Sequence, residues 1–418
     1  MRIALLCLGT QGDIRPFLAI ATGLREEGHE VLVFTNAPNE KICVENGFAF
    51  ISLAGNLAAL VNPEQFEIDQ GKIKLFNKLR RVIKEALSEQ FDVLHDQLQR
   101  VDGVLYHPAV FAAEHVIEAL GLPSLRIHFQ PDIRSKYYPC CIFPPKMPFQ
   151  RWSNWASHFI ADQLFWWPLR GVINRWRTQR LGLSKLGILS PLSKEPFRSI
   201  PKVIAVSRTL VPPAPDWPDN VHVSGYLQLD KAADWIPSVS LQAFLQAGSP
   251  PVYIGFGSLT EQCDAKMSQA IIGALSQSSE RFILCGPFLH FKTVSLPSNV
   301  IWIEAAPHDW LFPKMVAIVH HGGAGTTHAA LSMGKPALVI PFVLDQFHWG
   351  EAIYRKGLGP KPLLARKLTQ KAFLLSLEDL LSTRMYQTQA IDYARKMKEE
   401  KGVQQILHLV YEHFQETI

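Results

Sequence analysis

The chain has 418 residues, which is enough for two or three domains. It is 47% hydrophobic and 19% charged, as is usual for a folded enzyme, so each half can bury a large core. The formal net charge of +5 is too small to indicate nucleic-acid binding, which requires a concentrated basic surface. It is compatible with anionic small ligands or with an anionic membrane surface.

The six cysteines favour a reducing compartment. They form no C-x-x-C pair and no Cys/His zinc spacing, and several lie in apolar runs where a reduced thiol packs as a small hydrophobe. The apolar run 2–8 is followed by Asp13 and lacks a small-residue cleavage site, so it predicts a buried strand rather than a signal peptide. No uncharged run is long enough to cross a bilayer, and we expect a cytoplasmic protein.

The first half of the chain has the pattern of a parallel α/β sheet. The run 2–8, a helical pattern at 16–27 and a strand at 30–35 make one β-α-β unit. Its strands are apolar throughout, as expected where helices cover both faces of a sheet. Further strand-like runs lie near 101–106, 124–129 and 202–206.

The second half repeats this pattern after a proline-rich stretch. Strands are predicted at 252–256, 281–285, 300–303, 315–319 and 336–341, with helices near 264–277 and 325–333. We predict an α/β protein of two Rossmann-like domains facing across a cleft. The expected parts are domains at 1–220 and 241–386, a linker at 221–240 and C-terminal helices at 387–418.

The segment after Val319 is the most informative part of the sequence. An apolar strand leads into His320-His321-Gly322-Gly323-Ala324-Gly325-Thr326-Thr327 and then into a helical pattern. A strand, a glycine-rich loop and a helix start together present backbone N–H groups and a helix dipole to an anion. A second glycine-rich turn at 255–258 follows the first strand of the same domain, and the acid–amide pair Asp345-Gln346 follows a later one. Ligands in open α/β sheets bind at these carboxyl ends, so the pattern predicts a nucleotide-diphosphate-sugar site.

At this point the sequence resembles the UDP-glycosyltransferase superfamily. PHDWLFPKMVAIVHHGGAGTTHAALSMGKPALVIPFVLDQFHWG resembles the donor-binding signature, and GTQGDIRPFLAIATGLREEGHEV resembles the N-terminal opening of that family. Both, together with INRWRTQRLGL at 173–183, are most similar to the branch of sterol 3-beta-glucosyltransferases and bacterial natural-product glycosyltransferases. The resemblance implies a GT-B fold, inversion at the anomeric carbon and no metal. It also implies that the C-terminal helix packs back on the N-terminal domain.

The resemblance assigns site residues by position. It places the donor diphosphate contacts on Ser258, His321, Gly323, Gly325, Thr326 and Thr327. Asp345 and Gln346 are implied to bind the donor sugar. Nucleotide contacts are expected at Gly12, Ala306 and His308. Ala305 and Ala329 depart from the family at its uracil-stacking and ribose-binding positions, so UDP is favoured over dTDP only by its frequency in the family.

Asp13 is the candidate catalytic base. It follows the first strand, and the resemblance places an Asp at this position in the sterol branch. An inverting transfer needs a base within hydrogen-bond reach of the acceptor hydroxyl, and burial would raise the pKa of an Asp toward that role. The alternative is that Asp13 only caps the following helix.

His107, His128 and Trp155 are candidate acceptor contacts, although ordinary loop histidines and a core tryptophan are the simpler interpretation. Five tryptophans lie within 152–177, and residues 71–87 form a basic amphipathic pattern. They support the hypothesis of a lipophilic acceptor, sterol-like or polyketide-like, fetched at a membrane surface. A surface helix and a plain aromatic core are the alternatives.

The predicted function is therefore transfer of a hexose, most simply glucose, from a UDP-sugar to a hydroxyl of a lipophilic acceptor, with no metal and no cofactor. A dTDP-sugar donor is one alternative. A dehydrogenase fits poorly, because the loop at 9–12 lacks a full G-x-G-x-x-G and no acidic ribose ligand follows the second strand. A sugar-nucleotide epimerase would share the fold class, and a non-catalytic transferase-like partner protein is the alternative of another class.

Overall fold

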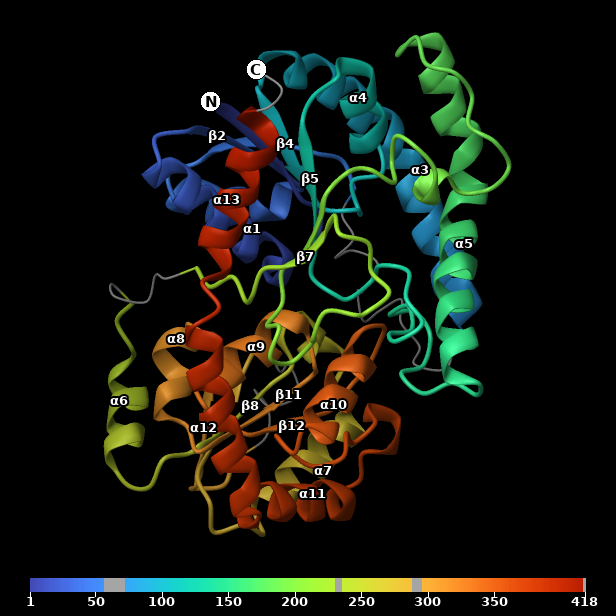
Figure 1. The fold of residues 1–418 in the computed structure, drawn as a ribbon. Helices are drawn as coiled ribbons and strands as arrows, with labels where there is room; N and C mark the ends of the chain where they lie inside the picture. The colour runs from blue at the N-terminus through green and yellow to red at the C-terminus, as the bar shows by residue number, and fades with distance from the viewer. Residues whose placement is uncertain (56–71, 230–234, 288–294, 416–418) are drawn as a thin grey trace. The chain divides into compact units, whose positions relative to one another are not determined.

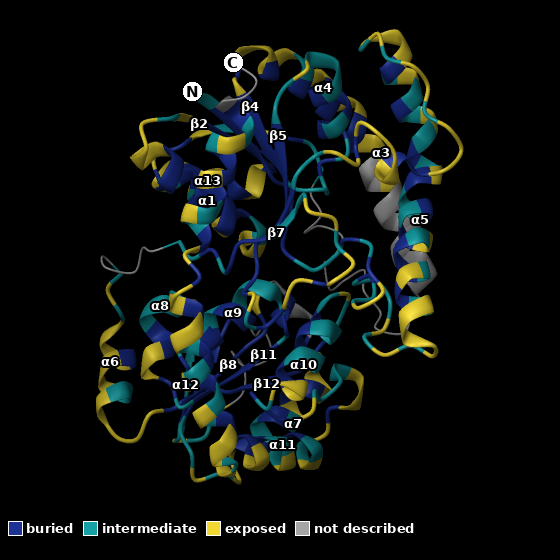
Figure 2. Ribbon diagram, in the orientation of Figure 1, coloured by how far each residue is buried: buried dark blue, intermediate teal, exposed yellow. Residues whose placement is uncertain are grey.

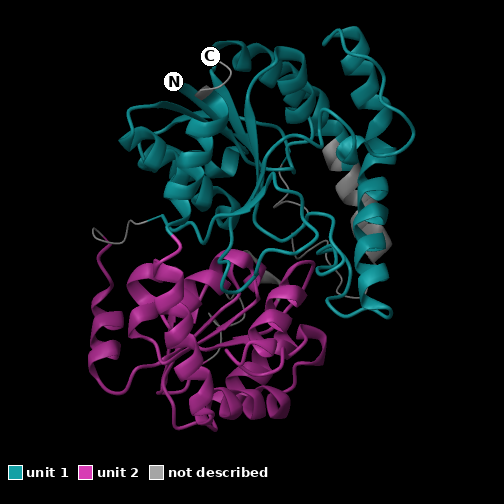
Figure 3. Ribbon diagram, viewed as in Figure 1, with its two compact units in different colours: residues 1–61, 69–229, 401–418 teal, residues 62–68, 230–400 magenta. Residues whose placement is uncertain are grey.

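The computed structural model describes residues 1–55, 72–229, 235–287 and 295–415. These residues form two compact units (Figure 3). Unit 1 contains the described residues up to 229 together with 401–415, and unit 2 contains the described residues from 235 to 400. Each unit has its own parallel sheet with helices packed on it, which confirms the predicted α/β class (Figure 1).

Unit 1 is built on seven parallel strands in the spatial order β3-β2-β1-β4-β5-β6-β7. The central strands are almost fully buried (Figure 2), because helices cover both sheet faces. The strands are β1 Arg2–Leu6, β2 Glu30–Thr35, β3 Ala49–Ser52, β4 Gly103–Tyr106, β5 Ser124–His128, β6 Lys202–Ile204 and β7 Val221–Val223.

Alternate residues of β1 face opposite sides of the sheet and pack on different helices. Ile3 and Leu5 belong to the core shared with α1 and α13, whereas Ala4 and Leu6 belong to the core shared with α3, α4 and α5. The helices of unit 1 are α1 Gln11–Glu26, α2 Glu40–Glu45, α3 Lys72–Gln97, α4 Ala113–Leu120, α5 Gln150–Gln179 and α13 Gly402–Gln415.

Helix α13, at the C-terminal end of the chain, packs on α1 and on the sheet of unit 1. The contact is close, because a Cβ atom on Gly103 would lie 2.3 Å from the ring of Phe414. Similarly, a Cβ atom on Gly23 of α1 would lie 2.7 Å from Val403. The prediction that the C-terminal helix returns to the N-terminal domain is confirmed.

Unit 2 is built on five parallel strands in the order β10-β9-β8-β11-β12. Helices α7 and α11 pack on one sheet face, and α9 packs against α12. The strands are β8 Val252–Gly255, β9 Phe282–Cys285, β10 Val300–Ile303, β11 Ala317–His320 and β12 Ala337–Val339. The helices are α6 Val239–Gln246, α7 Ala265–Leu275, α8 His308–Leu311, α9 Ala324–Ser332, α10 Gln346–Arg355, α11 Gln370–Ser382 and α12 Arg384–Lys398.

The structure differs from the sequence prediction at two places that bear on function. The predicted linker at 221–240 begins with β7, the edge strand of unit 1, and α6 starts at Val239 within its last residues. Helix α1 begins at Gln11 rather than near residue 16, because Thr10 and Asp13 cap each other reciprocally at its start. Asp13 therefore lies inside the first turn of a helix and not in the preceding loop.

Candidate active site

The three polar residues predicted in the first domain lie at one edge of the unit 1 sheet. Strands β1, β4 and β5 are neighbours and run parallel, so their carboxyl ends meet at the same edge. Asp13 follows β1, His107 follows β4 directly, and His128 is the last residue of β5. His107 and His128 therefore lie near each other, and His107 contributes to the lowered pKa of His128.

Asp13 is held in a defined orientation by Thr10. The backbone N–H of Thr10 donates to Asp13 Oδ2 at 2.8 Å, and the Thr10 hydroxyl donates to the same oxygen at 3.2 Å. Among the described residues, no hydrogen bond reaches Oδ1. Burial raises the pKa of Asp13, and the two bonds from Thr10 oppose that rise. The carboxyl is thus fixed through one oxygen, and its second oxygen is available. Its raised pKa makes it a stronger base than an exposed Asp.

Gly9 makes this arrangement sterically feasible. Its φ is +154°, and a Cβ atom there would lie 2.2 Å from Asp13 Oδ2. Two buried asparagines in the segment after β2 hold the glycine: Gly9 N–H donates to Asn36 Oδ1 at 3.1 Å, and Asn39 Nδ2 donates to Gly9 O at 3.1 Å. Sequence reasoning missed both asparagines, because their contact is made across more than 25 residues and follows no local motif.

His107 is neutral and has a defined tautomer. Ala109 N–H donates to His107 Nδ1 at 3.2 Å, so the ring carries its proton on Nε2. Burial lowers the pKa of His107 to about 4, although Asp132 opposes the shift. The ring stacks on Phe129, with 5.2 Å between ring centres.

His128 is buried, and its Nε2 has no hydrogen bond within the described part of the chain. Burial and the neighbouring Arg126 guanidinium lower its pKa well below the usual value. Arg126 is itself buried: its Nη2 lies 2.6 Å from Glu114 Oε1, and its Nε donates to Tyr106 Oη at 3.0 Å. This ion pair holds the positive charge of Arg126 beside His128, and the His128 ring therefore stays uncharged.

Trp155 lies on α5 and is 40% exposed. Its ring is parallel to Phe159, with 6.3 Å between ring centres, and the Arg134 guanidinium lies 5.5 Å from its centre. Arg134 is held by an ion pair with Asp162 at 2.7 Å. The structure therefore places Trp155 in a surface cluster of aromatic and cationic side chains. Within the described part of the chain, its ring contacts neither His107 nor His128.

In unit 2 the predicted diphosphate residues lie on neighbouring loops at the carboxyl ends of β8 and β11. His321 lies between these loops. A Cβ atom on Gly257, whose φ is +57°, would lie 3.3 Å from His321 Cε1, and one on Gly323 would lie 2.5 Å from His321 Nε2. Two glycines on separate loops thus make room for one imidazole ring.

The adjacent histidines differ in environment. His320 is fully buried, and its Nδ1 accepts a hydrogen bond from Gly322 N–H at 3.0 Å. His321 is half-buried, and burial lowers its pKa to about 4. At neutral pH it is therefore an uncharged ring that can donate one N–H to an anion. His320 instead maintains the loop.

Helix α9 begins at this loop with Gly323 as its N-cap, and no side chain caps its first turn. Ala324, Gly325 and Thr326 are half-buried, so their backbone N–H groups lie at an accessible helix start. Thr327, also predicted as a phosphate contact, is fully buried, and its hydroxyl has no hydrogen bond within the described residues.

The acid–amide pair follows β12. Trp349 Nε1 donates to Asp345 Oδ2 at 2.9 Å, which orients that half-buried carboxylate. Gln346 is buried, and its Oε1 accepts hydrogen bonds from the N–H groups of Phe342 and Val343 at 2.9 and 3.1 Å. Gln346 therefore stabilises the turn on which Asp345 lies. This role adds to its predicted contact with the donor sugar.

The predicted nucleotide contacts belong to both units. Ala306 follows β10, and its N–H bonds to Cys285 at the end of β9. His308 begins α8 and stacks on Phe312 at 4.2 Å between ring centres. Gly12 belongs to unit 1, where its N–H donates to Thr10 Oγ1 at 3.3 Å. The side chain of Ser258 lies outside the described residues.

A surface hollow of about 450 Å³ in unit 2 contains none of the predicted donor residues. It is lined by Pro237, Gln242, Leu245, Gln246, Gly248, Pro250, Pro251, Trp310 and Lys314. Several of these residues precede β8 or β11, at the opposite ends of the strands from the glycine-rich loops. Among the described helices, none is both long and apolar enough to cross a membrane.

Comparison with known proteins agrees with this geometry. Residues 3–139 match the glycosyltransferase family 28 N-terminal domain, and residues 288–410 match the C-terminal domain of proteins like erythromycin biosynthesis protein CIII. A sterol 3-beta-glucosyltransferase of Arabidopsis thaliana is 31% identical over 99% of this chain and 68% of its own length. The chain belongs to the glycosyltransferase family of the sterol 3-beta-glucosyltransferases. A sterol 3-beta-glucosyltransferase of Aspergillus clavatus is 32% identical over 98% of this chain, which spans only 30% of that relative.

Solved structures of this glycosyltransferase's fold confirm the GT-B prediction. The glycotransferase of kitacinnamycin superposes with a TM-score of 0.71 at 17% identity, covering 99% of this chain and 98% of its own. The glycosyltransferase VinC, solved in complex with DTDP, gives a TM-score of 0.67 at 16% identity, covering 100% of both chains. At these identities the likeness concerns the fold alone.

Proposed function

We propose that this glycosyltransferase moves glucose from UDP-glucose to a hydroxyl of a sterol-like or polyketide-like acceptor, with inversion and without a metal ion. The observation that carries the proposal is His321, whose ring lies between two glycine-rich loops beside the uncapped start of α9. The named relatives are sterol 3-beta-glucosyltransferases, which supports the choice of glucose and of a lipophilic acceptor.

In the site for the sugar donor, uncharged N–H groups rather than a cation would bind the diphosphate. The N–H of His321 and the backbone N–H groups of Gly325 and Thr326 are suited to diphosphate oxygens, and the helix dipole of α9 favours negative charge there. Charge grows on the diphosphate as the anomeric bond breaks, so these fixed donors would stabilise the transition state more than the ground state. Asp345, oriented by Trp349, would accept from sugar hydroxyls.

On the acceptor side, Asp13 would take the proton of the attacking hydroxyl. The acceptor oxygen bonds to the anomeric carbon, the bond from that carbon to the diphosphate breaks, and UDP leaves. Oδ1 would receive the proton, because Thr10 occupies Oδ2. His107 and His128 lie at the same sheet edge, and their neutral rings would contact an apolar acceptor without the cost of burying a charge.

We further propose that α5 makes peripheral contact with a membrane. Phe149, Trp152, Ile160 and Trp167 are 89%, 81%, 45% and 58% exposed, at spacings that recur on one side of a helix. Ile188, 67% exposed, extends this surface, since its carbonyl accepts from Trp167 Nε1 at 3.1 Å. Exposed tryptophans are typical of groups that enter the lipid interface.

Sedimentation with anionic vesicles tests the membrane proposal. The Trp152→Ser/Trp167→Ser double variant should lose most vesicle binding. Ile391→Ser is the matched control, because Ile391 is 57% exposed on α12 in the other unit. Equal binding of both variants and of the unchanged chain would refute the role of α5.

The donor and acceptor are tested in sequence. UDP-sugars and dTDP-sugars are screened for protection against thermal unfolding, and the best donor is then assayed with hydroxylated sterols and polyketides. We expect protection by UDP-glucose and a glucoside of inverted configuration, formed in the presence of a chelator. Stronger protection by dTDP-sugars would support the alternative donor. Neither protection nor slow donor hydrolysis would instead indicate a non-catalytic partner protein.

A further inference from the structure

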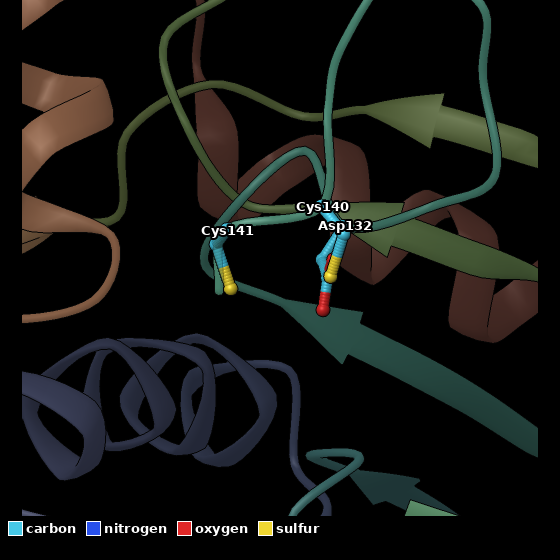
Figure 4. A group of neighbouring side chains, drawn as sticks. All are labelled: Asp132, Cys140 and Cys141. Carbon is cyan, nitrogen blue, oxygen red and sulfur yellow. The ribbon is translucent and has the colours of Figure 1, made fainter. Parts of the chain in front are cut away.

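A cluster of metal-ligating side chains lies in the loop that joins β5 to α5, and neither glycosyl transfer nor family membership requires it. Asp132, Cys140 and Cys141 each offer one ligand atom, and these three atoms lie within 4.8 Å of one another. Figure 4 shows the two sulfur atoms and the carboxyl group pointing to the same side of the loop. Such a compact arrangement is not expected from adjacent cysteines alone.

His158 of α5 lies beside this cluster, next to Asp132. Its Nδ1 lies 3.8 Å from Asp132 Oδ1, and its Nε2 lies 2.9 Å from the carbonyl oxygen of Tyr138. A carbonyl only accepts hydrogen bonds, so the ring carries a proton on Nε2 and turns Nδ1 toward the carboxylate. A metal-binding histidine commonly has this second contact, which fixes the ring orientation and the tautomer.

The cluster is partly buried. Cys140 and His158 are each only 3% exposed, Cys141 is half-buried, and the Asp132 side chain is 35% exposed. Asp132 Oδ1 is shielded from solvent, and the Cys140 thiol, a weak donor, interacts with this carboxylate. A shielded carboxylate oxygen that meets only a weak donor is costly, and a bound cation would compensate for it.

We propose that Asp132, Cys140 and Cys141 bind one divalent zinc-like cation, and that the neighbouring His158 ring moves toward the ion as the fourth ligand. Two sulfurs, one imidazole nitrogen and one carboxylate oxygen are a tetrahedral donor set of the kind that zinc prefers, whereas magnesium and calcium require oxygen ligands. Binding would release the two thiol protons to solvent, and the two thiolates and the carboxylate would offset the charge of the ion.

The ion would be structural. The loop is already attached to α5, because Cys140 N–H donates to Ser157 Oγ at 2.9 Å. A metal bond from the loop to His158 would strengthen that attachment. It would also fix the loop that begins at Phe129, the residue on which His107 stacks. The proposed transfer chemistry makes no use of this ion.

Metal titration of the full chain tests the proposal. The chain is stripped with a chelator under reducing conditions and titrated with Zn²⁺, and separately with Co²⁺, whose thiolate complexes absorb visibly. We expect one equivalent of tightly bound metal, a thiolate-to-cobalt absorption band and a rise in the thermal unfolding temperature on adding Zn²⁺.

Three variants assign the ligands. Cys140→Ala and Asp132→Asn should lower the affinity for Zn²⁺ by at least about tenfold, and Cys140→Ala should also weaken the cobalt band. Cys43→Ala is the matched control, because Cys43 is a fully buried thiol of the same unit that does not belong to the cluster. Asp132→Asn keeps the side-chain shape, so it remains informative if Cys140→Ala fails to fold. No metal bound by the unchanged chain, or the same affinity in Asp132→Asn, would overturn the proposal.

Discussion

Replacing Asp13 by Asn separates the two roles that the structure gives this residue. The amide oxygen of Asn can accept the same two hydrogen bonds from Thr10 that Oδ2 accepts now, at 2.8 and 3.2 Å. The cap of α1 should therefore persist, weakened only by loss of the negative charge, which contributes about 0.3–1 kcal/mol at a helix start. Relief from burying a charge offsets part of this, since burial raises the pKa of Asp13.

The effect on catalysis should be much larger. A general base contributes about 10²–10⁴ to the rate, which corresponds to about 3–5 kcal/mol of transition-state stabilisation. We expect kcat of Asp13→Asn to fall by that factor while the affinity for UDP, measured by calorimetry, is unchanged. The unfolding temperature should fall by no more than about 2–4 °C, as expected for about 1 kcal/mol in a domain of this size.

Thr10→Ala is the matched control. It removes the hydroxyl of the reciprocal cap, which should cost about 1 kcal/mol of stability, but it leaves the carboxylate in place. This variant should be less stable and still active. If Asp13→Asn keeps near-normal kcat, or if both variants lose activity only in proportion to their stability, Asp13 is a cap and not the base.

Three further results are expected. kcat/KM should fall as pH decreases through the raised pKa of Asp13, because the base must be ionised, and a flat acidic limb would contradict this. His321→Ala should weaken UDP binding by about tenfold or more in calorimetry, the loss of a hydrogen bond to a charged group, whereas His320→Ala should mainly lower the thermal unfolding temperature. Glu118→Ala should cost about 3–5 kcal/mol in urea unfolding, because it leaves the Arg177 guanidinium buried without its bidentate partner; a loss below about 1 kcal/mol would refute this.

Most parallel strands of both units could be predicted because their signal is local, whereas the short edge strands β3 and β7 of unit 1 were missed. Continuous apolar runs such as 2–8 and 315–319 correspond to β1 and β11, and the glycine-rich loop after β11 indicates a ligand site in combination with the turn at 255–258 and Asp345-Gln346. The start of α1 was within reach of sequence reasoning too, since Thr10 and Asp13 have the spacing of a capping box. An Asp in place of the usual Glu makes that motif easy to overlook.

Other features depend on tertiary contacts that no local pattern carries. The buried side of α5 includes polar residues such as Asn154, His158 and Arg177, so hydrophobic periodicity does not reveal which tryptophans face inward. Trp166 is 6% exposed and its neighbour Trp167 is 58% exposed. Burial of the Thr327 hydroxyl likewise follows from how α9 packs, which the donor motif alone does not reveal.

The packing of α13 on unit 1 has a consequence for biosynthesis. Its buried residues Ile406, Val410 and Phe414 complete a core whose other members begin at Ile3, so the first domain is assembled from both ends of this sequence. While a ribosome translates unit 2, the nascent unit 1 would expose the apolar side of α1 that α13 later covers. We therefore expect chaperones to bind the nascent chain until residues 402–415 emerge from the ribosome. The chaperones should then release the chain abruptly.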